Sequence, residues 1–136
     1  MAKIVGSEQV SAKLRKGVSR QGMDLVQSVL FEAGQRIQTD AQTSITEGAV
    51  SGAGHVPSLP GQPPNNDTGV LANNIETLET GPFHVTVSSN ARYSAALEFG
   101  TSKVAARPFM EPALQKNKKR ITKRVAAAVN QANRMK

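Results

Sequence analysis

The 136-residue chain contains no cysteine, no tryptophan, one tyrosine and four phenylalanines. The absence of cysteine excludes a disulfide framework and any thiolate metal site. The scarcity of aromatic residues predicts a lean core of Val, Leu, Ile and Ala in a single domain, residues 1–136. No apolar run approaches the roughly 20 residues that span a bilayer, and residues 1–20 lack the apolar segment of a signal peptide. We therefore expect a soluble protein that is not exported and does not contact membranes.

The chain also lacks the common catalytic and phosphate-binding motifs. It has no HExxH, CxxC or GxSxG sequence, and its glycine-rich stretch 48–61 is not followed by the Lys-Ser or Lys-Thr of a P-loop. His55 lies in a predicted loop and His84 on a predicted strand, each without a catalytic partner. The triplet Asp67-Thr68-Gly69 has no second aspartate placed to share a proton, as aspartic-protease chemistry requires. These absences predict a protein without enzymatic activity, metal or cofactor.

Positive charge is concentrated near the C-terminal end. Residues 1–112 carry nine Lys or Arg and ten Asp or Glu, a net charge of −1, whereas residues 113–136 carry eight basic residues and no acidic ones. A single basic element on a neutral body predicts one surface directed at an anionic partner. The residues expected to make that contact are Lys116, Lys118, Lys119, Arg120, Lys123 and Arg124.

Apolar residues recur at spacings of three and four over residues 22–45, which predicts a long amphipathic helix. Its apolar stripe consists of Met23, Val26, Leu30, Ala33, Ile37, Ala41 and Ile45. Its other face is expected to be solvated or to meet a partner, and it carries Asp24, Gln27, Gln35, Asp40 and Gln42. A second amphipathic helix, basic outside its apolar stripe, is predicted over about 109–134, and a shorter helix is expected between Ser7 and Gly17.

Between the two long helices the hydrophobic period changes to two. Apolar and polar residues alternate around Gly81-Pro82, with Phe83 expected on the second strand, which predicts a β-hairpin over 75–89. Because a hairpin alone is marginally stable, Ile4-Val5, a strand from the preceding loop or a neighbouring subunit must extend the sheet. The predicted fold class is α+β, with a small antiparallel sheet packed against the long N-terminal helix and the basic C-terminal helix.

Residues 46–69 contain five glycines and four prolines and show no apolar period, which predicts a long loop. Asp67 or Thr68 is the expected N-cap of a short helix that follows through Val70 and Leu71.

The segment 91–114 is predicted to be a hinge between two helices. A short run of low polarity ends at Gly100, because glycine most readily adopts the left-handed conformation that closes a helix. Arg107-Pro108 favours an extended residue followed by a helix start, and Pro112 repeats the signal, so the last helix should begin between Pro108 and Ala113.

Side chains around this hinge carry two further predictions. Phe99, Phe109 and Met110 are expected to hold the turn against the core. Glu98 and Arg107 flank the turn, and either form an ion pair across it or are solvated.

Two blocks of sequence carry a family resemblance. The first is Glu98-Phe99-Gly100-Thr101, then Ala106-Arg107-Pro108-Phe109 and Pro112-Ala113-Leu114. The second is a proline-rich loop with Pro60, Gly61, Pro63 and Pro64, followed by a turn with Asp67, Thr68, Gly69 and Leu71. In order and spacing these blocks resemble the signature of a family of small neck proteins from long-tailed double-stranded DNA phages, the tail-completion or head-tail joining proteins.

The resemblance implies a structural virion protein made in the host bacterial cytoplasm. It implies a homo-oligomeric ring of six copies at the head-tail interface or the tail end. The implied partners are other copies of the chain, connector or stopper proteins, and tail terminator or tail-tube proteins. The loop at 46–69 is then either a flexible connector or an arm that reaches over a neighbouring subunit.

The basic helix leaves three interpretations open: a solvated face, contact with genome phosphates, or docking on acidic protein surfaces. The alternative to a neck protein is a small basic soluble protein that binds duplex DNA non-specifically through this helix. Base-specific readout is not expected, since the chain has no DNA-reading motif and few aromatic residues for stacking.

Overall fold

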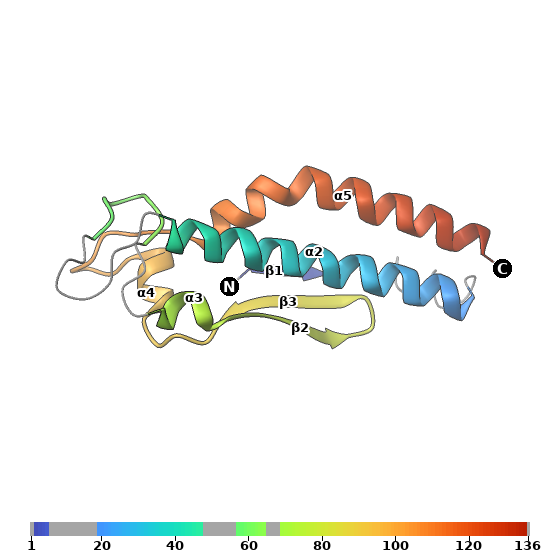
Figure 1. The fold of residues 1–136 in the computed structure, drawn as a ribbon, viewed down its shortest axis with the longest axis horizontal. Helices are drawn as coiled ribbons and strands as arrows, with labels where there is room; N and C mark the ends of the chain where they lie inside the picture. Colours follow the sequence, from blue (N-terminus) through green and yellow to red (C-terminus); the bar gives the residue numbers. More distant parts are fainter. Residues whose placement is uncertain (1, 6–18, 48–56, 65–68, 136) are drawn as a thin grey trace.

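The computed structural model describes residues 2–5, 19–47, 57–64 and 69–135. The elements follow in the order β1 (Ala2–Val5), α2 (Arg20–Thr46), α3 (Val70–Asn73), β2 (Ile75–Gly81), β3 (His84–Ser89), α4 (Ser94–Phe99) and α5 (Met110–Arg134). Figure 1 shows an elongated body in which α2 lies between α5 and the β2–β3 hairpin. The predicted α+β class is confirmed.

Helix α2 forms where the apolar periodicity predicts it. The Ser19 side chain caps its first turn, because the Ser19 hydroxyl accepts a hydrogen bond from the Gly22 N–H at 3.2 Å. The helix then runs for 27 residues to Thr46. Its buried stripe is the main part of the core and includes Val26, Leu30, Ala33, Ile37, Ala41 and Ile45.

The sheet has three antiparallel strands in the order β1-β3-β2, so the N-terminal segment is what extends the hairpin. Ile4 pairs with Val85, and Thr77 pairs with Val87. β3 is the central strand, with a partner strand along each edge. Its four inner residues, Val85 to Ser88, are all buried, including the polar Thr86 and Ser88.

The predicted hairpin is confirmed, but Phe83 lies in the turn and not on the second strand. Its φ of 55° turns the chain, its ring is buried, and its N–H donates to Gln27 Oε1 at 2.7 Å. A side chain of α2 thereby holds the hairpin turn.

The polar face of α2 is less solvated than predicted. Gln27 and Gln42 bond within the chain, the latter to the Ala72 carbonyl at 2.9 Å. Asp40 accepts a 2.6 Å hydrogen bond from the Asn117 amide, and Asn117 is almost fully buried between α2 and α5. This face was expected to be solvated or to meet a partner, and these three residues instead bond neighbouring elements of the same chain.

The predicted loop is described only in part. Residues 57–64 carry no helix or strand, while 48–56 and 65–68 lie outside the described residues, as does the short helix expected between Ser7 and Gly17. Helix α3 begins at Val70, and its N-cap is Gly69 with a φ of 84°, not Asp67 or Thr68. Glycine suits this position because it adopts a positive φ at no steric cost.

Close packing between α2 and the sheet depends on Gly34. A Cβ at this position would lie 2.7 Å from Thr77 Cγ2 and 2.8 Å from Val85 Cγ1. Both neighbours are β-branched side chains with few rotamers, so they cannot move aside easily. The sheet therefore lies as close to α2 as it does because position 34 has no side chain.

We expect Gly34→Ala to destabilise the protein by about 1–3 kcal/mol, as overpacking of a core does, although alanine is the better helix former by about 1 kcal/mol. Urea unfolding followed by circular dichroism measures the change. Gln35→Ala, at an exposed position one residue along, is the control and should alter stability by less than about 0.5 kcal/mol. A stabilised Gly34→Ala protein would show that the sheet does not need this approach.

Candidate functional site

The hinge between α4 and α5 has the closing glycine that the sequence predicts. Gly100 follows α4 with a φ of 75°, and its N–H donates to the Ala96 carbonyl at 2.9 Å. A Cβ at Gly100 would lie 2.9 Å from the Ala106 nitrogen. The chain then folds back through a tight turn in which the Thr101 N–H donates to the Val104 carbonyl at 2.8 Å.

Glu98 caps α5 from the neighbouring helix. Its carboxylate is buried, with the residue only 9% exposed. One oxygen accepts hydrogen bonds from the N–H groups of Phe109 and Met110 at 2.8 and 3.0 Å, and the other accepts from Glu111 at 2.9 Å. Phe109, at the N-cap position, has no side chain that could do this. The carboxylate therefore satisfies three free donors and places a negative charge at the positive end of the helix dipole.

The ion pair considered between Glu98 and Arg107 was wrong. Within the described residues Glu98 bonds only the start of α5, and Arg107 Nε donates to the Ser58 carbonyl at 3.2 Å. Next to this contact, the Gly61 N–H donates to the Ala106 carbonyl at 2.9 Å. The proline-rich loop and the hinge, 49 residues apart at Ser58 and Arg107, are thus held together.

Of the three residues expected to hold the turn against the core, two do so. Phe109 and Met110 are 1% and 2% exposed, but Phe99 is 73% exposed. Successive residues of a helix point about 100° apart, so turning Glu98 inward to cap α5 turns Phe99 outward. Phe99 therefore lies on the surface, at the rim of a pocket that also borders Phe109 and Met110.

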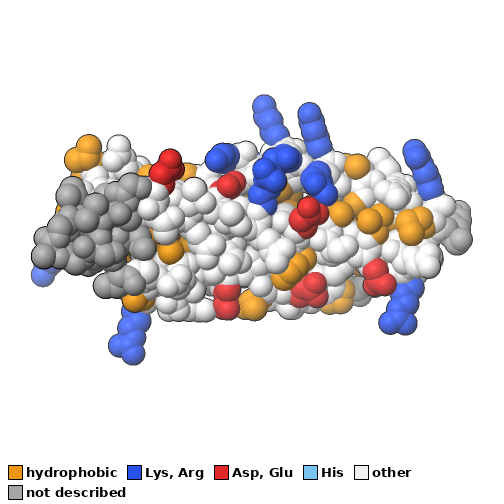
Figure 2. Space-filling model, in the orientation of Figure 1, with side chains coloured by type: hydrophobic (Ala, Val, Ile, Leu, Met, Phe, Trp, Pro, Cys, Tyr) orange, Lys and Arg blue, Asp and Glu red, His pale blue; other side chains and the backbone are white. Residues whose placement is uncertain are grey.

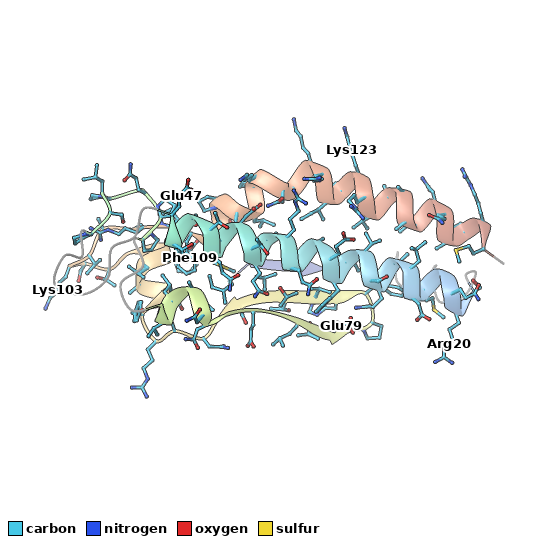
Figure 3. The ribbon with its side chains drawn as sticks, in the orientation of Figure 1. Arg20, Glu47, Glu79, Lys103, Phe109 and Lys123 are labelled. Atoms are coloured by element: carbon cyan, nitrogen blue, oxygen red, sulfur yellow. The ribbon has the colours of Figure 1, made fainter. Side chains whose placement is uncertain are left out.

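All six residues predicted for anionic contact are exposed on α5, but they do not form one surface. Helical geometry places Lys116, Lys119 and Lys123 opposite the buried stripe, with Lys118 on one flank and Arg120 and Arg124 on the other. Figures 2 and 3 show basic side chains standing away from α5, Lys123 among them.

Arg120 and Arg124 face α2 and line a groove between the two helices. Its other lining residues are Val29, Glu32, Ala33, Arg36 and Ile121. Arg124 forms an exposed salt bridge with Glu32 at 3.0 Å. Arg36 was missed by sequence reasoning; its spacing of seven from Val29 places it on the same face of α2, but nothing local indicates that α5 lies beside that face.

In the described ranges no three His, Asp or Glu side chains converge in a way that could hold a metal ion. No helix of these ranges combines the length and apolarity of a membrane span. His84 lies next to the hairpin turn, where its ring contacts the Thr80 hydroxyl, and His55 falls outside the described residues.

A scan of family models matches residues 8–100 to HK97-gp10_like, described as "Bacteriophage HK97-gp10, putative tail-component". The matched range is more than half of the chain and contains α2, the hairpin and α4. It ends at Gly100, so the second half of the hinge and the whole of α5 lie beyond it. Searches of curated proteins and of solved structures gave no match.

We expect Glu98→Ala to destabilise the protein by about 2–4 kcal/mol, because two buried N–H groups and one partly buried N–H group lose a charged acceptor. Thermal or urea unfolding measures the loss. Glu111→Ala is the matched control: this exposed carboxylate lies in the first turn of the same helix and should cost no more than about 1 kcal/mol. Equal effects of the two substitutions would mean that only the charge near the helix end matters and not the three hydrogen bonds.

Proposed function

The chain belongs to the HK97-gp10-like family of bacteriophage tail components, and we propose that it forms a homo-oligomeric ring at the head-tail interface or the tail end. The family match carries this proposal, since it assigns a structural role in a tailed virion. We infer a hexamer that completes the tail or joins it to the head. Its function is then mechanical and connective, without catalysis.

The hinge end of the body supports a role in assembly. It exposes apolar side chains from three loops or helices, namely Leu59, Tyr93, Phe99 and Val104. Exposed apolar groups on a small protein commonly mark surfaces that a partner covers. The contacts of Glu98, Gly100 and Arg107 fix the backbone at this end of the body. The exposed apolar groups therefore form a fixed surface for the connector, stopper, terminator or tail-tube proteins that a neck ring contacts.

We expect about six or twelve copies of the chain in each purified particle, because a ring matched to a tail tube is built from a small closed set of identical subunits. Quantitative mass spectrometry measures the copy number relative to a portal or tail-tube protein. The portal protein provides the internal standard. Absence of the chain from particles would sink the ring proposal.

The second candidate is a small soluble protein that binds duplex DNA non-specifically. Exposed lysines on the back of α5, among them Lys116, Lys119 and Lys123, favour it, because they form no hydrogen bond or ion pair with described residues. Phosphate contact requires only clustered cations and carries no sequence information.

Titration of duplex DNA at several salt concentrations separates the two candidates. A neck protein should bind free DNA weakly. The second candidate instead requires tight binding whose log-log salt dependence has a slope of roughly −0.9 per phosphate contacted. The variant Lys119→Glu/Lys123→Glu reports whether any binding uses α5.

A further inference from the structure

The groove between α2 and α5 has an apolar floor and a basic rim. Val29, Ala33 and Ile121 form the floor, and the guanidinium groups come from Arg36, Arg120 and Arg124. The one acidic lining residue, Glu32, is paired with Arg124. Three arginines thus line the groove with a single carboxylate, and that carboxylate pairs only with Arg124 among the described residues.

Arg36 and Arg120 have no hydrogen bond or ion pair with any described residue. Like charges gathered on neighbouring helical positions repel one another, and a bound anion removes that cost. Arginine also presents planar, paired donors that match a carboxylate better than lysine does. The groove therefore suits a ligand that carries an anionic group next to an apolar side chain.

The same chain carries a surface with these properties on β2. Because β2 is the last strand in the order β1-β3-β2, one of its edges is not paired with any strand of the described residues. Ile75 is buried and Thr77 bonds Gln38 of α2, so the alternate residues Glu76 and Leu78 point to the opposite face of the sheet. Leu78 is 44% exposed and Glu76 is partly exposed, whereas Glu79 pairs with Val85 and points with Thr77 toward the α2 side.

The carboxylate of Glu76 is held in place for a partner. One of its oxygens accepts a hydrogen bond from the Asn90 amide at 2.6 Å, which leaves the other oxygen available. An apolar side chain two residues along from a carboxylate on the same face matches the apolar floor and arginine rim of the groove. Figure 3 shows Glu79 and Lys123 on opposite sides of the body, so β2 cannot reach the α5 side of its own copy.

We propose that the groove between α2 and α5 binds the edge strand β2 of a second copy of this chain through Glu76 and Leu78. Leu78 enters over the apolar floor, and the carboxylate of Glu76, two residues before it on the same face, meets Arg36 and Arg120. Two different surfaces of the same chain then join head to tail. Such a contact closes into a ring when its rotation allows, so the proposal rests on the ring put forward above and names the interface between its subunits.

The apolar floor favours this occupant over DNA. A phosphodiester backbone needs cations alone, and the lysines on the back of α5 provide those without a recess. A carboxylate next to a leucine uses both the arginines and the floor, which explains why Val29, Ala33 and Ile121 lie where they do.

Charge reversal tests the contact. The groove variant is Arg36→Glu/Arg120→Glu, and the edge variant is Glu76→Arg. Each should raise the dissociation constant for self-association by at least roughly tenfold, since reversing one partner of an interfacial charge pair replaces attraction with repulsion. The chain that carries all three substitutions should recover self-association. Sedimentation velocity over a range of concentrations measures all four proteins.

The matched control is Lys119→Glu/Lys123→Glu, which makes the same change in charge on the back of the same helix. It should associate as the unaltered protein does. Arg36 and Arg120 are exposed and Glu76 is partly exposed, so circular dichroism melts should show that every variant folds, with no loss beyond that of the Glu76–Asn90 hydrogen bond. If the control also lost self-association, the change in net charge alone would account for the result with the groove variant, and the proposal would be overturned.

The same variants are then tested for incorporation into phage particles, which decides the matter if the free protein stays monomeric. The groove and edge variants should be excluded from particles and the combined variant readmitted. Normal incorporation of the groove variant would overturn the proposed contact while leaving the ring intact. Groove-dependent self-association of a chain that is absent from particles would instead overturn the ring and leave the contact standing. A groove variant that loses only DNA affinity would assign the arginines to phosphate and overturn the proposal.

Discussion

The fold depends on one buried carboxylate, that of Glu98, at the start of α5. Charged acceptors are stable in a protein interior only where donors surround them, and here three backbone N–H groups of a helix end do so. The carboxylate obtains the donors that its burial requires, and the helix end obtains an acceptor that its own N-cap residue does not supply. It fixes where α5 begins relative to α4, and so sets the path of the whole basic helix along α2.

Further along the two helices, a second polar contact keeps that path. Asn117, which is almost fully buried, donates to Asp40 across the helix pair. This hydrogen bond favours one register, because sliding the helices would break it and leave the Asn117 amide with only the Ala113 carbonyl of its own helix. Three residues beyond Asn117, Arg120 faces α2 and joins Arg36 at the groove. The groove is therefore a consequence of how α5 is capped and registered, and both the proposed ring and its proposed subunit contact require that geometry.

Most of the secondary structure could be predicted from the sequence because each element has a local cause. The apolar spacing of α2, the two-residue period of the hairpin and the glycine after α4 act over a few residues each. The errors have a common origin. Phe99 was placed inside because it is a large apolar residue, whereas the neighbouring carboxylate had the stronger requirement for the inward position. Likewise Arg107 bonds the backbone of a distant loop in place of the nearest acidic side chain.

The sequence by itself determined the two long helices and the hairpin between them, the concentration of positive charge on the last helix, and the position of the hinge at Gly100. These properties follow from local conformational preference and from the order of residues in the chain, so they do not depend on contacts between distant segments. Only the tertiary structure decided which residues meet: Glu98 with the start of α5, Ser58 with Arg107, and Arg36 with Arg120. The packing of surfaces and the requirement of buried polar groups for hydrogen-bond partners determine such pairs. Neither of these two causes produces a periodic pattern in the sequence.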